Sequence, residues 1–187
     1  ATRYSFDMLG EGARTNEDAE RYLVSYANAI DVVGEAAGGL GPHASNGVSV
    51  KLSALHPRYE ARQEERVVRE LYPRMLQLAQ AAKKWNIGLS LDAEEADRLV
   101  LQLKLFEKLA LEPSLKDWEG LGIVIQAYQK RTRSEIERLV SLSRRRGAPI
   151  QTRLVKGAYW DGEVKRAQVM GRPDFPVWTT KAATDVH

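Results

Sequence analysis

Five polar or charged side chains stand near the ends of five short segments that are apolar or alternate in polarity. They are Asp7, Lys51, Asp92, Gln126 and Arg153, and successive members are 44, 41, 34 and 27 residues apart. These spacings are typical of consecutive strand-plus-helix units, so in a barrel of such units the five side chains converge on one rim, where active sites lie. The two cations suit an anionic ligand, or a reaction in which negative charge develops.

A purely structural role for the same residues is the alternative. Lys51, Asp92 and Arg153 could neutralise one another, because leaving such groups buried and unpaired costs several kcal/mol each. One residue of this kind would carry little weight. Five at matching positions favour a binding or catalytic site.

Other chemistries lack the residues that they need. The sequence has no cysteine, which excludes disulfides, thiolate nucleophiles and cysteine zinc sites. The histidines, His43, His56 and His187, lack the spacing of metal ligands, and no two carboxylates share a strand end, so no metal is expected. Ser53 lies in KLSAL, without the Gly-x-Ser-x-Gly turn. GLGPHA at 39–44 formally matches a dinucleotide fingerprint but follows a helical pattern and contains proline, so a loop is expected.

Composition indicates an ordinary globular chain. Hydrophobic residues make up 43% and charged residues 28%, and 28 Lys and Arg exceed 25 Asp and Glu only slightly, which is too weak an excess to indicate nucleic acid. The densest basic cluster, Arg144-Arg145-Arg146, precedes Gly147 and suits a helix C-terminus. No run approaches the ~20 apolar residues of a membrane span, and no signal peptide is seen. A cytoplasmic protein is expected.

Strands and helices are predicted to alternate along the whole chain. Strands are expected at 3–9, 47–53, 87–93, 120–128 and 150–156. Helices are expected at about 16–37, 62–85, 94–111, 133–146 and 161–171. This alternation calls for a parallel sheet with helices outside it, either an open doubly wound sheet or a (β/α)8 barrel.

Three features are expected at particular places in the helices. Thr15 with Asp18, and Thr132 with Glu135, have the spacing of capping boxes at helix starts. Pro73 is expected to kink or split the second helix, because proline has no N–H for the helical ladder.

The faces of the strands favour the barrel. In VSVKLS, residues 48, 50 and 52 are apolar and 49, 51 and 53 are polar, and IGLSLD alternates in the same way. A doubly wound sheet covered on both faces would need apolar residues at both parities. A small, polar second face is typical of a barrel whose upper interior is hollow for a ligand.

The segment that follows Arg153 has the composition of a cofactor loop. In KGAYWDGE, Gly157 lets the backbone approach a ligand closely, and Tyr159 and Trp160 offer aromatic faces. A flat conjugated cofactor would fit such surroundings.

Five segments in order carry a family resemblance: RYSFDMLGE, KLSALHPRYE, DAEEADR, QAYQKR and RLVKGAYWD. They closely resemble the bacterial proline dehydrogenases, the flavin domain of bifunctional proline utilization A proteins, over essentially all 187 residues. The resemblance implies a (β/α)8 TIM-type barrel, with residues 1–187 forming about the first five βα units of a partial proline dehydrogenase domain. It also implies FAD and the oxidation of L-proline to Δ1-pyrroline-5-carboxylate, with hydride passing to flavin N5 and the proline nitrogen losing a proton.

The resemblance assigns contacts to the cofactor. Arg153 hydrogen-bonds the flavin near N5, and Gln126 contacts the isoalloxazine ring. A fixed guanidinium stays charged, so Arg153 can stabilise the negative charge that a reduced flavin gains. The other implied cofactor contacts are Val155, Lys156, Gly157, Ala158, Trp160, Trp178, Thr179 and Thr180.

The resemblance also assigns contacts to the substrate. Lys51 meets the proline carboxylate, Asp92 orients its neighbours and Tyr159 packs on the substrate ring, while Glu11 belongs to a lid ion pair. Lys51, Asp92 and Arg153 are the expected catalytic residues.

The sequence departs from the family pattern in one respect. Five strands do not close an eight-stranded barrel, and the family's Tyr-x-x-Arg-Arg element is absent; Arg144–Arg146 cannot replace it, since Ser141 stands where the tyrosine should be. A fragment of a longer protein is therefore expected, inactive alone. Its expected partners are L-proline, a quinone or other electron acceptor, and the rest of the chain with a pyrroline-5-carboxylate dehydrogenase domain. The full-length protein is expected in the cytoplasm, and a peripheral place at the inner face of the cytoplasmic membrane is left open.

Two rival functions remain at this point. A barrel enzyme acting on a phosphorylated metabolite could use Lys51 and Arg153 as anion clamps and would be colourless. A nucleic-acid-binding module would show salt-sensitive DNA binding, and no segment of the chain resembles one.

Overall fold

The computed structural model describes residues 2–186, so His187 lies outside the described residues. Its centre is one parallel sheet whose strands follow the order β1-β2-β3-β4-β5. The strands are β1 Ser5–Asp7, β2 Gly47–Val50, β3 Gly88–Leu91, β4 Leu121–Gln126 and β5 Gln151–Val155. A doubly wound sheet would reverse its strand order at a switch point, whereas this sequential order is that of a barrel wall.

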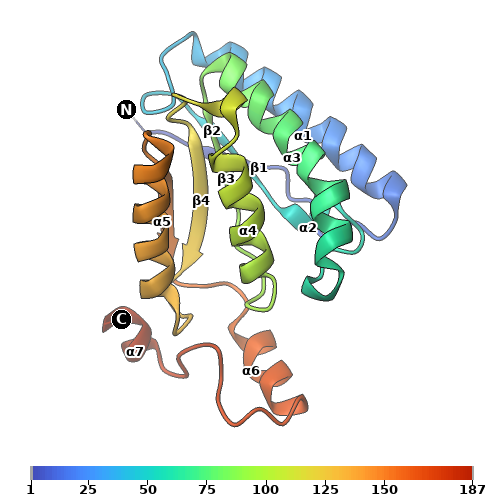
Figure 1. Ribbon diagram of the computed structural model, residues 1–187, viewed down its shortest axis with the longest axis vertical. Helices are drawn as coiled ribbons and strands as arrows, with labels where there is room; N and C mark the ends of the chain where they lie inside the picture. The colour runs from blue at the N-terminus through green and yellow to red at the C-terminus, as the bar shows by residue number, and fades with distance from the viewer. Residues whose placement is uncertain (1, 187) are drawn as a thin grey trace.

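Helices cover one side of this wall, as Figure 1 shows. They are α1 Asn16–Ala37, α2 Leu52–Leu55, α3 Glu64–Trp85, α4 Leu99–Ala110, α5 Thr132–Arg146, α6 Trp160–Val169 and α7 Lys181–Val186, with 3-10 turns at Ala61–Gln63 and Pro113–Leu115. The core lies between helices and sheet, where Tyr26, Ile30, Leu89, Leu91 and Phe106 are almost wholly buried. Helices α6 and α7 lie beyond the carboxyl end of β4 (Figure 1).

The start of α1 follows the predicted capping box. The Thr15 hydroxyl accepts from the Asp18 N–H, and the Asp18 carboxylate accepts from the Thr15 N–H. Gly38 ends the helix in a left-handed conformation with φ 56°.

Two predicted helix features differ in the structure. Helix α3 is not split at Pro73, because this residue lies on the exposed face, where water can solvate the carbonyl four residues earlier. The kink expected at Pro73 stays a prediction. Thr132 is not an N-cap either: it is the first residue of α5, and its hydroxyl donates to the Gln126 carbonyl at 2.6 Å. The Glu135 carboxylate accepts instead from Arg131.

Helix α4 begins five residues later than predicted, at Leu99 rather than residue 94. Residues 93–98 form a loop and turn at the carboxyl end of β3. The side chains of Gln126 and Glu163 bind backbone groups of this segment and hold it out of the helix. None of the described helices is both long and apolar enough to cross a bilayer.

Candidate functional site

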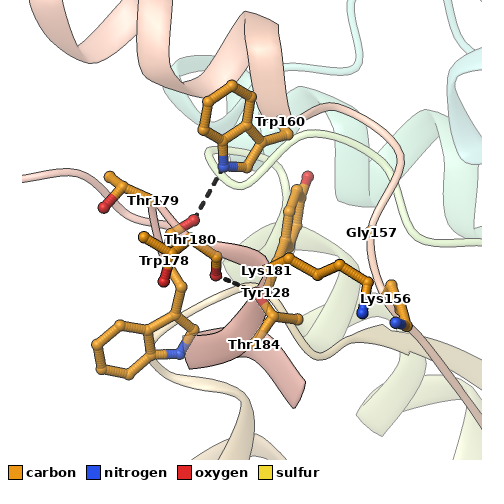
Figure 2. A pocket seen from close by; sticks show the side chains of 9 residues that line it. All are labelled: Tyr128, Lys156, Gly157, Trp160, Trp178, Thr179, Thr180, Lys181 and Thr184. Atoms are coloured by element: carbon orange, nitrogen blue, oxygen red, sulfur yellow. Dashed lines mark hydrogen bonds between the residues drawn. The ribbon is translucent and has the colours of Figure 1, made fainter. Parts of the chain in front are cut away.

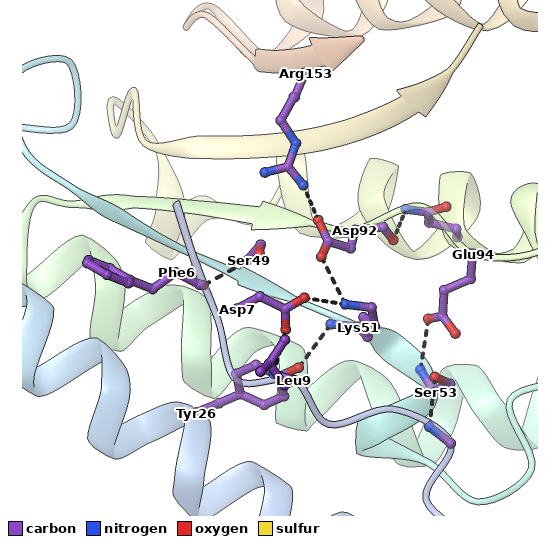
Figure 3. A network of polar contacts seen from close by, with 12 residues as sticks. Phe6, Asp7, Leu9, Tyr26, Ser49, Lys51, Ser53, Asp92, Glu94 and Arg153 are labelled. Carbon is purple, nitrogen blue, oxygen red and sulfur yellow. Dashed lines mark hydrogen bonds and ion pairs between the residues drawn. The ribbon is translucent and has the colours of Figure 1, made fainter. Parts of the chain in front are cut away.

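The predicted strand-end residues form a chain of ion pairs at the carboxyl edge of the sheet (Figure 3). The Lys51 ammonium contacts one carboxylate oxygen of Asp7 and lies 3.4 Å from Asp92 Oδ2. The Arg153 guanidinium donates from Nη2 to Asp92 Oδ1 at 2.5 Å. Asp92 therefore stands between two cations that come from strands on either side of it.

Arg153 faces the interior side of the wall and not the surrounding helices. Its neighbour in register is Val124, and its side chain crosses β4 to reach Asp92 (Figure 3). The side chain of Arg153 is 44% exposed while that of Asp92 is 10% exposed, so the guanidinium keeps an accessible face toward the barrel interior.

Lys51 is held as a cation. Burial alone lowers the pKa of Lys51, but the hydrogen bond to Asp7 and the charges of Asp92 and Asp7 outweigh it, and the pKa is raised above its usual range. The backbone N–H of Lys51 also donates to the Tyr26 hydroxyl at 3.2 Å, and burial raises the pKa of Tyr26 to about 12. A charged ammonium at this rim can bind a carboxylate.

Gln126 joins the ends of two loops. Its Nε2 donates to the Glu94 carbonyl at 2.9 Å, and its Oε1 accepts from the Ala158 N–H at 3.0 Å. The residue is 3% exposed. Gln126 thus fixes the turn after β3 against the loop after β5, and its amide orientation is set by both partners.

Two buried carboxylates were not predicted from the sequence. Glu94 accepts from the Ser53 N–H at 2.9 Å and pairs with Arg98 at 2.8 Å, while Glu163 of α6 accepts from the Ala96 N–H at 2.5 Å. Burial raises the pKa of both. The acidic run DAEEADR, directly after a strand, was the one local signal for Glu94. Glu163 had none, because its partner lies 67 residues away.

A hollow of about 370 Å³ opens beside the loop that follows β5 (Figure 2). It is lined by Tyr128, Lys156, Gly157, Trp160, Trp178, Thr179, Thr180, Lys181 and Thr184. Six of these are expected cofactor contacts: Lys156, Gly157, Trp160, Trp178, Thr179 and Thr180. The structure therefore gathers residues from both sides of α6 around one cavity; Tyr128, Lys181 and Thr184 were not anticipated.

Hydrogen bonds between aromatic residues and backbone hold the walls of this hollow. Trp160 Nε1 donates to the Trp178 carbonyl at 2.9 Å (Figure 2). The Trp178 N–H donates to the Tyr128 carbonyl at 2.7 Å. The strand pairing of β4 and β5 continues here, since the carbonyls of Val155 and Lys156 accept from residues 127 and 128.

Glycine at 157 is required by a contact within the chain, and the predicted close approach of its backbone to a ligand stays a prediction. Its φ is 137°, and a Cβ at this position would lie 2.5 Å from Cγ of Tyr128. A side chain at position 157 would thus clash with the Tyr128 ring. Glycine lets this aromatic residue close one wall of the hollow.

Tyr159 and Glu11 lie close enough for the charge of Glu11 to act on the tyrosine. The Tyr159 N–H donates to the Tyr128 hydroxyl at 3.3 Å, and burial together with the charge of Glu11 raises the pKa of Tyr159 to about 12. Glu11 is exposed and forms no ion pair with any residue between 2 and 186. The lid ion pair stays a prediction.

Comparison with known proteins gives this geometry a family. A family model for proline dehydrogenase matches residues 1–187. The chain belongs to the proline dehydrogenase family. The predicted resemblance is confirmed, and so is the barrel-type α/β fold class.

Among relatives of this proline dehydrogenase chain is the bifunctional protein PutA of Salmonella typhimurium, 54% identical over 98% of the chain. The bifunctional protein PutA of Escherichia coli is 53% identical over the same share. The chain covers 14% of the length of each.

Solved structures agree with these matches. Proline utilization A of Bradyrhizobium japonicum superposes with a TM-score of 0.96 at 54% identity, over 99% of this chain and 19% of that one. Proline utilization A of Bdellovibrio bacteriovorus, in a form inactivated by N-propargylglycine, gives a TM-score of 0.89 at 30% identity, over 97% of this chain and 20% of that one. The chain thus spans about a fifth of the solved proteins that it resembles.

Proposed function

We propose that this chain is the part of a proline dehydrogenase that binds FAD and oxidises L-proline to Δ1-pyrroline-5-carboxylate. The observation that carries the proposal is the Arg153–Asp92 pair, which holds a half-exposed guanidinium beside Lys51 at the carboxyl rim. Such a rim offers one cation for a substrate carboxylate and another for negative charge that develops on an acceptor.

The residues around the hollow fit a flavin cofactor. The cavity combines the aromatic side chains of Tyr128 and Trp160, the ammonium of Lys156 and threonine hydroxyls, which suits a ligand with both flat and phosphate-bearing parts. We infer that Lys156, Gly157, Trp160, Trp178, Thr179 and Thr180 hold FAD there, with Val155 and Ala158 beside it. When bound, FAD supplies the hydride acceptor, its N5 atom, while the proline nitrogen loses a proton.

Each rim residue has one role in this proposal. Arg153 donates toward the flavin near N5, and because its direction is fixed by Asp92 it needs no reorganisation as charge develops. Lys51 binds the proline carboxylate, and Tyr159 packs on the proline ring.

Gln126 acts through the loop that it fixes. Its side-chain oxygen holds the Ala158 N–H at 3.0 Å, so Gln126 sets the path of the cofactor loop as well as contacting the isoalloxazine ring.

The domain assignment is part of the same proposal. Residues 1–187 correspond to the first five βα units of a (β/α)8 barrel, and the remaining units, with the arginines that complete the carboxylate site and the pair for Glu11, belong to the rest of the protein. A pyrroline-5-carboxylate dehydrogenase domain and a quinone or other electron acceptor are the expected partners. A cytoplasmic location, with a peripheral place at the membrane, is proposed on the same grounds.

The visible spectrum of the full-length protein tests the proposal. A yellow protein whose flavin absorbance is bleached by proline is expected. A colourless preparation that also fails to take up added FAD would reject it and favour the barrel enzyme for phosphorylated metabolites. The 187-residue piece is expected to show no turnover with proline, FAD and a dye acceptor.

A further inference from the structure

Asp7 has two oxygens that bind two different parts of the site. Its Oδ2 accepts from the Lys51 ammonium, and its Oδ1 accepts from the Leu9 N–H at 2.9 Å (Figure 3). Asp7 is the last residue of β1 and one of the five polar residues at the strand ends, and the proposed function gives it no role. One carboxylate thus contacts both the Lys51 ammonium and the loop that leads to α1.

The backbone that Asp7 holds adopts an unfavourable conformation. Leu9 has a φ of 53° and is 90% exposed, so no packing of the leucine within residues 2–186 explains why the chain turns here. Leucine rarely occupies the left-handed region. The hydrogen bond from its N–H to Asp7 is the contact that fixes this turn.

The far end of the same loop has a separate anchor. The Gly12 N–H donates to the Ser53 hydroxyl at 3.1 Å, and the Ala13 N–H donates to the Ser53 carbonyl at 2.8 Å. Ser53 lies two residues after Lys51. Between the anchors at Asp7 and Ser53 the loop carries Glu11, whose charge acts on Tyr159.

We propose that Asp7 is a positioning residue that couples the Lys51 ammonium to the conformation of the loop at residues 8–14. The inference rests on the proposed function, because it takes Lys51 as the cation for a carboxylate ligand. One oxygen of Asp7 sets the direction of the Lys51 ammonium. The other fixes the backbone of the loop and so sets the position of Glu11. An anionic ligand that binds Lys51 therefore binds a cation whose position depends on the same carboxylate that orders the loop.

Amide hydrogen exchange on the full-length protein tests whether Asp7 orders the loop, and the measurement does not depend on enzyme activity. In Asp7→Ala the amides of residues 9–12 are expected to exchange at least 10-fold faster, while those of α1 and α3 keep their rates. Asp7→Asn retains an acceptor oxygen and is expected to keep most of the protection. Equal loss of protection in both variants, or no loss in Asp7→Ala, would overturn this part of the proposal.

A comparison of single and double variants tests whether Asp7 acts on ligand binding through Lys51. The probe is cyclopentanecarboxylate, a ring carboxylate that cannot be oxidised as proline is, with cyclopentanecarboxamide as the uncharged control. Asp7→Asn is expected to change the affinity for the carboxylate at least 5-fold in the native background and less than 2-fold in a Lys51→Met background. Its effect on KM for proline should also exceed its effect on kcat. Changes that are equal in both backgrounds would show that Asp7 does not act through Lys51.

A matched variant separates these effects from general damage. Asp31→Asn makes the same chemical change on α1, where the carboxylate accepts from Trp85 Nε1, and is expected to alter neither loop exchange nor ligand affinity. Failure of the proposed function would appear separately, as a full-length protein without flavin absorbance. The exchange experiment would then still decide whether Asp7 orders the loop.

Discussion

The guanidinium of Arg153 and the carboxylate of Asp92 join strands that are not neighbours in the sheet. Arg153 belongs to β5 and Asp92 follows β3, and the pair bridges them across β4 at an N···O distance of 2.5 Å. Extending the strand register by one residue places Lys51, Asp92, Val124 and Arg153 in one row across the wall. The two cations therefore share one carboxylate because they belong to the same layer of the barrel.

Removing the guanidinium is expected to abolish the proposed chemistry without unfolding the protein. Arg153→Met in the full-length protein should lower the rate of flavin reduction by proline about 100-fold or more, the usual effect of losing one preorganised donor. Arg153→Lys keeps the charge but not the planar fork, so an intermediate loss is expected. Stopped-flow absorbance measures these rates. Arg133→Met, which alters an exposed pair with Glu137 on α5, is the control and should leave the rate unchanged.

The ammonium of Lys51 should not titrate at any working pH. Because its pKa is raised, the charge is complete below the unfolded value of about 10.4 and is lost only as the pH rises through the still higher folded value. Binding of cyclopentanecarboxylate, measured by calorimetry, should therefore stay constant from pH 7 to 10. Lys51→Met should weaken it roughly 10- to 100-fold, as expected for a lost charged hydrogen bond. A decline centred between pH 8 and 9 would contradict the assignment.

Two glycines near the hollow should respond oppositely to alanine. Gly157→Ala meets both a φ of 137° and the Tyr128 ring, so a loss of at least about 2 kcal/mol in unfolding free energy is expected, with weakened FAD binding. Gly162 lies in α6 with open space around its Cβ position, and Gly162→Ala should stabilise the protein by about 0.5–1 kcal/mol. Chemical denaturation of the full-length protein gives both values. Comparable losses at the two positions would refute the role of the ring contact.

The amide of Gln126 cannot be replaced by a carboxylate. Gln126→Glu would place an oxygen against the Glu94 carbonyl where an N–H now donates, at an expected cost of about 1–3 kcal/mol. The loop that begins at Val155 should loosen, which a fall in FAD affinity would report. Gln80→Glu, at an exposed position on α3, provides the control. Unchanged FAD affinity in Gln126→Glu would show that the turn after β3 does not position the cofactor loop.

Local patterns in the sequence were enough for the wall and its polar rim. Short runs of apolar or alternating residues marked each strand, and the capping box at Thr15 marked the start of α1, because strand faces and helix caps depend on residues within a few positions of one another. The repetition of strand-plus-helix units then predicted that Lys51, Asp92 and Arg153 would lie at one edge. The five sequence motifs around these residues identified the protein family.

Only the tertiary structure decided which partner each polar group has. The sequence could not show that Glu163 binds the Ala96 N–H, that Tyr128 fills the space beside Gly157, or that Thr132 donates to Gln126 instead of capping α5. Glu163 and Gly157 meet groups that lie far from them in the chain. The Thr132 hydroxyl could either accept from the nearby Glu135 N–H or donate to the nearby Gln126 carbonyl. The type of a residue determines how many hydrogen bonds its side chain can make. The packing of the helices and strands determines which atoms are close enough to make them.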